Sequence, residues 1–297
     1  MANTREIRRR IKSIKNTQQI TRAMQTVSAS KMRKAQQAAT SGREYATILN
    51  RVLVSLRERV DEESHALLAA RPVKKELTIL ISTDKGLCGA LNTNLFREAS
   101  HLDREKTDFV ASGRKAVQYL ARTKRHLVAD YVVKDAATLT ETRAISRFAI
   151  EKFLSGEVDK VNVVYTRFVN TLTQVPTILT LLPITPASLP GGVAKVGALD
   201  TPVNPAADPN NRFGYIFAPS ETEVLDAILP EYVHFQVFQM VLDARASEHS
   251  ARMVAMKNAT DNAKTIIKDL TLEYNKVRQA AITTELLEIT TAQMAMG

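Results

Sequence analysis

The sequence predicts an α/β fold: a long antiparallel coiled coil of the N- and C-terminal helices, plus an inserted Rossmann-like open α/β domain. Both ends of the chain carry apolar or small residues at alternate spacings of four and three, which is typical of coiled-coil helices. Between them, short apolar runs alternate with helical patterns, as in an open α/β sheet. A stretch rich in Pro and Gly then precedes the C-terminal helix.

The C-terminal helix is predicted over residues 220–297, and its most regular part begins at Glu231. No Gly or Pro falls between Glu231 and Met296. Sixty-odd residues in one helix span roughly 90 Å, more than the width of an ordinary globular domain. A seven-residue period drifts around a straight helix, so its stripe requires a second helix wound around it. The stripe consists of Leu242, Ala246, His249, Met253, Met256, Thr260, Ala263, Ile267, Leu270, Tyr274, Val277, Ala281 and Thr284.

The N-terminal helix is predicted over residues 1–60, and no Pro precedes Pro72. We favour an intramolecular antiparallel hairpin with the C-terminal helix, because the two are of similar length. Two unrelated helices in a bundle or in separate dimers are the alternative. The seam is polar in its middle, where a coiled coil built for stability would carry Leu or Ile. The seam residues are Ile7, Ile11, Ile14, Gln18, Thr21, Gln25, Ser28, Met32, Ala35, Ala39, Gly42, Ala46, Leu49, Leu53, Leu56 and Val60.

Residues 73–182 are predicted to form the α/β domain. The run Leu77–Ser82 is almost wholly apolar, as in a buried parallel strand, and leads into a turn and a helix. The other expected strands are Phe109–Ser112, Leu127–Val133, Val161–Phe168 and Val175–Leu182. The expected helices are Asn92–Arg104, Arg114–Ala121 and Leu139–Leu154.

Residues 183–219 are predicted to be a linker, because Pro and Gly punctuate a stretch with few charges and no clear period. Ser220 and Glu223 fit a capping box at the start of the C-terminal helix. Pro230 lies within the helical pattern. It is expected to kink the helix and to separate a short helix from the long one.

Charge is distributed unevenly along the chain of 297 residues, whose formal net charge is +10. Residues 1–60 hold 14 Lys or Arg and 3 Glu, a surplus of 11, so the other 237 residues together carry −1. The basic N-terminal helix therefore predicts an acidic partner surface.

No apolar run reaches the roughly 18 residues that a membrane span needs. The N-terminus has no apolar signal core, and its charged start shares the coiled-coil seam, which disfavours a presequence. A single cysteine, Cys88, permits no internal disulfide and fits a reducing compartment.

No catalytic, cofactor or metal site is predicted. The turn from Gly86 to Gly89 follows a strand but lacks both phosphate-loop spacings, so a tight strand-to-helix turn is favoured. Cys88 could be a nucleophile, although a small buried thiol is the simpler interpretation. The five histidines, of which His249 lies on the coiled-coil seam, have no metal-ligand spacing.

The residues themselves resemble the γ subunits of F-type ATP synthases over essentially the whole chain. The matching motifs are Arg5-Glu6-Ile7-Arg8, the runs 14–24 and 29–34, Ser82–Gly89, Gln174–Thr177, Ser247-Glu248, and the runs 251–257, 259–262, 274–280 and 282–285. One departure is Ala292-Gln293, where the family has Gly-Ala. The linker has no cysteine, so the thiol switch of the chloroplast γ subunits is not expected.

The resemblance implies a non-catalytic rotor shaft that couples rotation of a membrane ring, driven by protons or sodium ions, to the catalytic β subunits. The implied partners are the α and β subunits, the ε subunit and the proteolipid c-ring, with no nucleic acid and no direct membrane insertion. The implied location is peripheral, on the cytoplasmic face of the bacterial inner membrane. No cofactor is implied.

By residue-level match to the family, we expect rotor–stator contacts at Met24, Arg252, Arg278, Gln279 and Thr283. Arginines suit this role because a guanidinium can pair with carboxylates on successive β subunits. Arg8, Arg9, Arg10 and Lys12 would form a basic shaft face toward the surrounding subunits, and a solvated helix face is the alternative for each.

Two other functions are consistent with the patterns. A basic coiled-coil structural protein that binds nucleic acid would explain the first helix, and it would bind DNA in a salt-sensitive manner. An α/β enzyme with helical appendages would explain the sheet, and it would bind a ligand near Lys85–Gly89.

Overall fold

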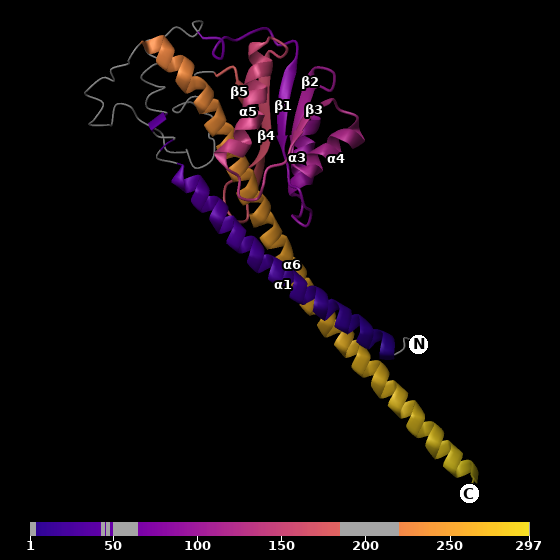
Figure 1. The fold of residues 1–297 in the computed structure, drawn as a ribbon. Coiled ribbons are helices and arrows are strands. Elements are labelled where there is room, and N and C mark those ends of the chain that lie inside the picture. Colours follow the sequence, from indigo (N-terminus) through magenta and orange to yellow (C-terminus); the bar gives the residue numbers. More distant parts are fainter. Residues whose placement is uncertain (1–3, 43–44, 46–47, 50–64, 185–219, 297) are drawn as a thin grey trace. The chain divides into compact units, whose positions relative to one another are not determined.

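A computed structural model describes residues 4–42, 45, 48–49, 65–184 and 220–296 of the chain (Figure 1). The chain divides into two compact units. The helical unit comprises residues 1–28 and 252–297, and the sheet unit comprises residues 29–251. Helix α1 (Thr4–Ser41) and helix α6 (Glu221–Met296) each contribute to both units.

The sheet unit contains a five-stranded sheet in the order β3-β2-β1-β4-β5. The strands are β1 (Glu76–Ile81), β2 (Thr107–Ser112), β3 (Leu127–Tyr131), β4 (Lys160–Phe168) and β5 (Gln174–Leu182). All neighbouring strands are parallel except β4 and β5, which form an antiparallel hairpin. The predicted Rossmann-like open sheet is therefore confirmed, with one antiparallel edge strand added.

Both faces of the sheet are covered, which explains the apolar run of β1. On one face, Leu77, Ile79 and Ile81 pack in a cluster with α5 (Leu139–Leu154) and α6. On the other face, Leu80 packs with α3 (Leu91–Ser100) and α4 (Arg114–Thr123). Successive strand residues point to opposite faces, so a strand buried on both sides is apolar throughout.

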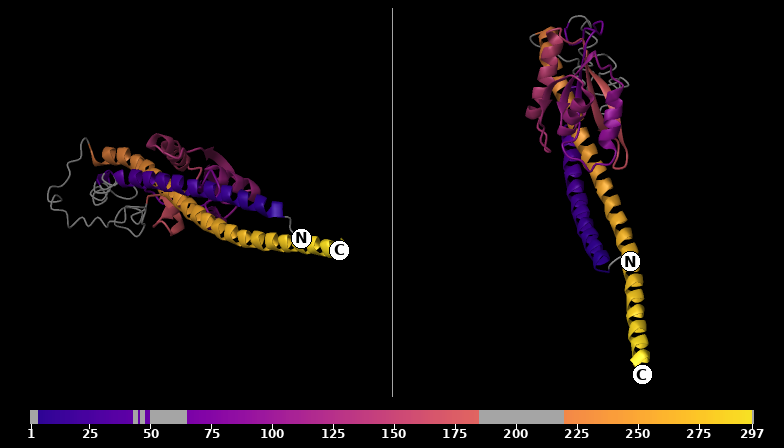
Figure 2. Two further views of the ribbon diagram at one scale, coloured as in Figure 1. Left: turned by 90° about the horizontal axis from the view of Figure 1, so that it is seen from below. Right: turned by 90° about the vertical axis from the view of Figure 1, so that its right-hand side faces the viewer.

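The helical unit is an antiparallel pair, as predicted (Figure 2). The Thr21 and Thr260 hydroxyl oxygens lie 2.7 Å apart across it, and Nη2 of Arg8 donates to the Tyr274 hydroxyl at 3.1 Å. The seam positions Ile7, Thr21 and Ser28 of α1 are buried, and so are Met256 and Ala263 of α6. The sequence period thus identified the buried stripe of both helices, including its polar middle.

Helix α1 ends at Ser41, before the predicted limit at residue 60, and Gly42 lies in a turn. A Cβ at Gly42 would lie 2.5 Å from Nε2 of Gln239, so a side chain there would collide with α6. Residues 50–60 of the predicted helix and residues 185–219 of the predicted linker lie outside the described residues.

Pro230 does not divide the C-terminal helix: α6 is one helix from Glu221 to Met296, so the prediction of two helices was wrong. Proline inside a helix costs about 3 kcal/mol. Around Pro230, Leu225, Leu229 and Val233 are buried in the same apolar cluster as the sheet, and this packing outweighs the local cost. The predicted cap is present, because the Glu223 backbone N–H donates to Oγ of Ser220 at 3.2 Å. A kink at Pro230 stays a prediction.

Candidate functional site: an exposed helical tip and a buried polar junction

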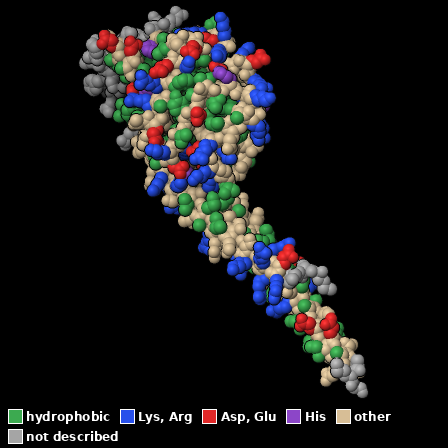
Figure 3. Space-filling view, turned by 45° about the vertical axis from the view of Figure 1, so that its right-hand side comes forward, with side chains coloured by type: hydrophobic (Ala, Val, Ile, Leu, Met, Phe, Trp, Pro, Cys, Tyr) green, Lys and Arg blue, Asp and Glu red, His purple; other side chains and the backbone are tan. Residues whose placement is uncertain are grey.

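The last part of α6, which we call the tip segment (residues 278–294), is exposed at every residue. It carries large apolar side chains at its surface: Ile282, Leu286, Leu287, Ile289 and Met294. Leu286 is 58% exposed and Met294 is 83% exposed. Figure 3 shows hydrophobic side chains at the surface of the narrow helical end, and Lys and Arg side chains gathered further from that end.

The apolar residues of the tip segment include a stripe at helical spacing. Ile282, Leu286 and Ile289 follow one another at intervals of four and three, so they share one face of the helix. An exposed apolar stripe on a helix indicates a surface that another molecule covers. The tip segment is therefore a candidate contact surface for another molecule.

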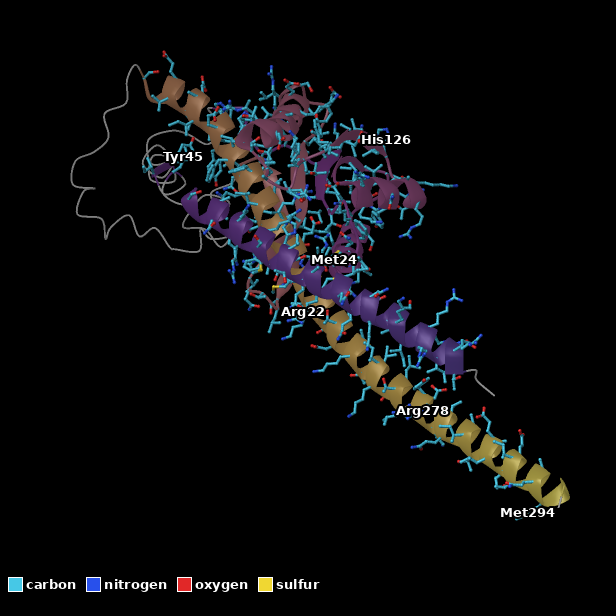
Figure 4. The ribbon with its side chains drawn as sticks, turned by 60° about the horizontal axis from the view of Figure 1, so that its bottom comes forward. Arg22, Met24, Tyr45, His126, Arg278 and Met294 are labelled. Atoms are coloured by element: carbon cyan, nitrogen blue, oxygen red, sulfur yellow. The ribbon has the colours of Figure 1, made fainter. Side chains whose placement is uncertain are left out.

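Three of the predicted contact residues lie in the tip segment, and all are exposed. They are Arg278, Gln279 and Thr283, within about one and a half turns of helix. Figure 4 shows Arg278 and Met294 on the C-terminal part of α6. The Thr283 hydroxyl donates to the Gln279 carbonyl oxygen at 2.9 Å, an ordinary contact within the helix.

The other two predicted contact residues differ in exposure. Met24 is half-buried, and Arg252 is only 8% exposed within its own chain. A guanidinium this covered is directed mainly toward its own chain. The role of Arg252 as a rotor–stator contact stays a prediction.

The four residues of the predicted basic face, Arg8, Arg9, Arg10 and Lys12, are all exposed. Two of them also have partners within the helical unit. The guanidinium of Arg8 lies 5.6 Å from the centre of the Tyr274 ring, besides its hydrogen bond to that hydroxyl. Nη2 of Arg10 pairs with Oε1 of Glu6 at 2.6 Å. A solvated ion pair of this kind contributes little stability, so the face stays available to an acidic partner.

A second feature lies in the sheet unit, at the carboxyl ends of the parallel strands. Open α/β sheets bind ligands there, at the point where the strand order reverses. In this sheet that point is between β1 and β4. Residues of α6 bond to the ends of these strands and to the loops that follow them. The polar junction, as we call this cluster, consists of Asp84, Arg245, Ser247, Glu248 and Ser250.

Arg245 is the centre of the polar junction, and its side chain is 5% exposed. Its guanidinium pairs with Oε2 of Glu248 at 2.9 Å and with Oδ2 of Asp84 at 3.4 Å, and it donates to the Val133 carbonyl oxygen. Asp84 follows β1 and Val133 follows β3. Arg245 therefore bridges the loops that follow β1 and β3.

Two serines extend the polar junction to the β4–β5 hairpin. The Ser247 hydroxyl donates to the Thr166 carbonyl oxygen at 3.0 Å, and the Ser250 hydroxyl donates to the Thr171 carbonyl oxygen at 2.8 Å. On α1, Lys31 pairs with Asp135, which follows β3. This ion pair lowers the pKa of the Asp135 carboxyl, chiefly through the Lys31 hydrogen bond. These bonds join the loops at one edge of the sheet to the two long helices within the sheet unit.

Asp243 is a buried carboxyl five residues before Glu248 on α6, and it is 6% exposed. Burial raises its pKa to about 7, although the Arg167 guanidinium acts in the opposite direction. Its Oδ2 atom has no hydrogen-bond partner among the described residues. The Tyr165 hydroxyl, also buried, has its pKa raised by burial and by Asp243.

The turn from Gly86 to Gly89 is a connection between β1 and α3, as the sequence predicted. Leu87 and Gly89 have φ angles of 63° and 59°, which allow the chain to turn tightly before the helix. Cys88 is buried, and its Sγ accepts a hydrogen bond from Nδ2 of Asn92 at 3.4 Å. The interpretation as a buried thiol is thus confirmed.

The described residues also bear on metal binding and on membrane spanning. No group of three or more His, Cys, Asp or Glu side chains there is arranged to hold a metal ion. Within the same residues, every helix is too short or too polar to span a bilayer.

Sequence reasoning identified the tip residues but missed the apolar stripe beside them and the polar junction. The stripe was detectable, because Ile282, Leu286 and Ile289 follow a helical spacing. The polar junction had no such signal: Arg245 and Glu248 are charged residues in a long helix, and such residues usually face solvent.

Known proteins of one family resemble this chain over nearly its whole length. The family model described as ATP synthase matches residues 3–296. A relative from Opitutus terrae, the ATP synthase gamma chain, is 50% identical over 99% of each chain. The ATP synthase gamma chain of Akkermansia muciniphila is 46% identical over the whole of both chains.

Solved structures share the fold at lower identity. The rotor of the Euglena gracilis mitochondrial ATP synthase is similar with a TM-score of 0.65 at 20% identity, over 94% of this chain and 98% of that one. The central stalk of the Tetrahymena thermophila mitochondrial ATP synthase is similar with a TM-score of 0.59 at 24% identity, over 81% of this chain and 99% of that one. This likeness shows the shared fold, and the matching family model and the full-length relatives show that the chain belongs to the ATP synthase gamma chain family.

Proposed function

We propose that this chain is the central-stalk rotor subunit of a proton- or sodium-translocating ATP synthase. It couples rotation of the membrane ring to conformational changes at the catalytic β subunits. The observation that carries the proposal is the tip segment, a single helix exposed at every residue from 278 to 294 and bearing an apolar stripe. Full-length relatives named ATP synthase gamma chain support it.

The tip segment suits insertion into a ring of subunits. Its apolar side chains lose their contact with water when a surrounding sleeve covers them, and each fully buried Leu or Ile contributes about 1.5–3 kcal/mol. Arg278, Gln279 and Thr283 add polar contacts at its base. The basic face of α1, with Arg9 and Lys12, suits acidic surfaces on the surrounding α and β subunits.

The remaining partners are the ε subunit and the c-ring, which we place against the sheet unit. The similar structures, a rotor and a central stalk with its c-ring, support this assignment. Binding to such a ring is peripheral, and in a bacterium it places the chain on the cytoplasmic face of the inner membrane.

The chain itself carries no reaction in this proposal. The polar junction supports that view, because the charges of Asp84 and Glu248 near the carboxyl ends of the strands are paired with Arg245 of the same chain. ATP is made or hydrolysed in the neighbouring subunits. The alternative of a nucleic-acid-binding protein receives no support from the family model and the relatives, which are described as ATP synthase.

The test is co-expression with the α and β subunits of the same organism, followed by size exclusion and an ATPase assay. We expect one complex that contains all three chains and whose turnover depends on γ. Arg278→Ala/Gln279→Ala should lower turnover or coupling, because two polar contacts at the base of the tip segment are lost. Lys268→Ala, at an exposed position of α6 outside the tip segment, is the matched control. Separate elution of γ, with unchanged activity of the other subunits, would refute the proposal.

A further inference from the structure

The polar junction differs in kind from the rest of the contact between α6 and the sheet. Most of that contact is apolar: Val233, Val237 and Val241 of α6 belong to the same buried cluster as Ile79 and Val163. Apolar contact has no preferred direction, so it restrains a turn of the helix only through the shape of the packed side chains. Polar groups add a restraint that depends on direction.

Arg245 supplies such restraint from a single side chain. Its planar guanidinium presents donors in fixed directions, and its acceptors come from the loop after β1, the loop after β3 and α6 itself. Asp84 extends the connection, because its Oδ1 accepts the backbone N–H of Arg114, the first residue of α4, at 3.0 Å. A turn of α6 about its own axis would break these bonds together.

We propose that Arg245 is a positioning residue that fixes the rotational position of α6 on the sheet, so that torque passes between them without slippage. This inference rests on the proposed rotor function. Glu248 holds the guanidinium on α6, and Asp84 and the Val133 carbonyl oxygen hold it on the sheet. Leaving either carboxylate without its partner would place an uncompensated charge in a buried site.

The chain offers a matched comparison for this role. Arg143 of α5 pairs with Glu231 of α6, so it also joins the sheet unit's own helices to α6. That pair is exposed, with 47% and 41% of the two side chains accessible, and exposed ion pairs contribute little. Arg→Lys at both positions retains the charge and removes the planar fork.

The experiment uses the complete synthase in membrane vesicles, with γ as wild type, Arg245→Lys, Asp84→Asn or Arg143→Lys. ATP hydrolysis and ATP-driven ion pumping are measured on the same vesicles, with and without an opposing ion gradient. For Arg245→Lys and Asp84→Asn we expect hydrolysis within about twofold of wild type. Under the opposing gradient, we expect at least about a threefold fall in ions pumped per ATP. Arg143→Lys should behave as wild type.

The outcomes separate positioning from stability. A wild-type ratio of pumping to hydrolysis in both Arg245→Lys and Asp84→Asn would overturn the inference. So would an equal loss of pumping and hydrolysis, or failure of both variants to assemble, because either result indicates a structural role alone. Absence of coupled pumping with wild-type γ would instead refute the proposed function.

Discussion

At the scale of single residues, the sheet unit buries the charged side chains of Asp243, Arg245 and Glu248. Arg245 and Glu248 neutralise one another, with Asp84 and the Val133 carbonyl oxygen as further acceptors. The Asp243 carboxylate is less well stabilised, because one of its oxygens lacks a hydrogen-bond partner among the described residues. Burial of the charged form is therefore disfavoured, which is why its pKa is raised to about 7.

Asp243 should make the stability of the fold depend on pH. Its pKa is about 7 in the folded chain and near 3.8 when unfolded, so the folded state holds the proton more tightly. The stabilisation is complete below about pH 4 and is lost as pH rises through 7, by up to about 4 kcal/mol. Asp243→Asn removes the ionisation, so its gain in melting temperature should be larger at pH 8.5 than at pH 5.

Thermal unfolding of the purified chain at both pH values measures this gain. Asp130→Asn, at an exposed position of β3, is the control and should change the melting temperature little at either pH. A loss of stability in Asp243→Asn that is the same at both pH values would contradict the account. It would mean that the carboxylate makes a favourable contact.

At the scale of elements, local sequence signals decided most of the fold. The boundaries of β1, β4, α4 and α5 differ from the predicted ones by at most two residues. The seam of the helical unit followed from the four-three spacing alone, although its middle is polar. Thr21 and Thr260 show why a polar seam is tolerated: one hydroxyl donates to the other, which donates to a carbonyl oxygen of its own helix, so neither is left unsatisfied.

Tertiary packing decided the elements that sequence reasoning missed. The continuity of α6 across Pro230 depends on apolar contacts to strands distant in the sequence. The polar junction depends in the same way on Asp84, Val133 and Arg245, which only the folded sheet brings together. Neither feature has a local pattern in the sequence.

Pro230 provides a test of that explanation. If packing keeps α6 continuous against a local penalty, Pro230→Ala restores a backbone donor and removes the ring, and should stabilise the chain by up to about 3 kcal/mol. Urea unfolding measures the change. Destabilisation would indicate instead that the proline sets the direction in which Leu229 and Val233 enter the core.

The tip segment provides a second test at this scale. Leu286→Gln/Ile289→Gln shortens the apolar stripe without changing charge or helical tendency. We expect weaker aggregation of the isolated chain and at least about tenfold weaker association with the α and β subunits. Glu285→Gln/Glu288→Gln is the matched control, because it alters exposed residues between the apolar ones. Equal effects of the two double variants would show that the stripe is not buried in the complex.

At the scale of the whole molecule, the two units present different surfaces. The helical unit supplies the tip segment and the basic face of α1, both suited to a surrounding ring of subunits. The sheet unit supplies a platform whose loops at the carboxyl ends of the strands are bonded to side chains of α6. The family and its fold were predictable from motifs along the whole chain, whereas the polar junction required the structure.

Rotation of the chain inside its complex tests this account most directly. A complex with the α and β subunits is immobilised through β, and a visible probe is attached to a cysteine at Gln118, an exposed position of α4. The native Cys88 is buried, so labelling is selective for the new cysteine. The account predicts that the probe turns continuously in one direction while ATP is hydrolysed. A probe that stays fixed during sustained hydrolysis would contradict it.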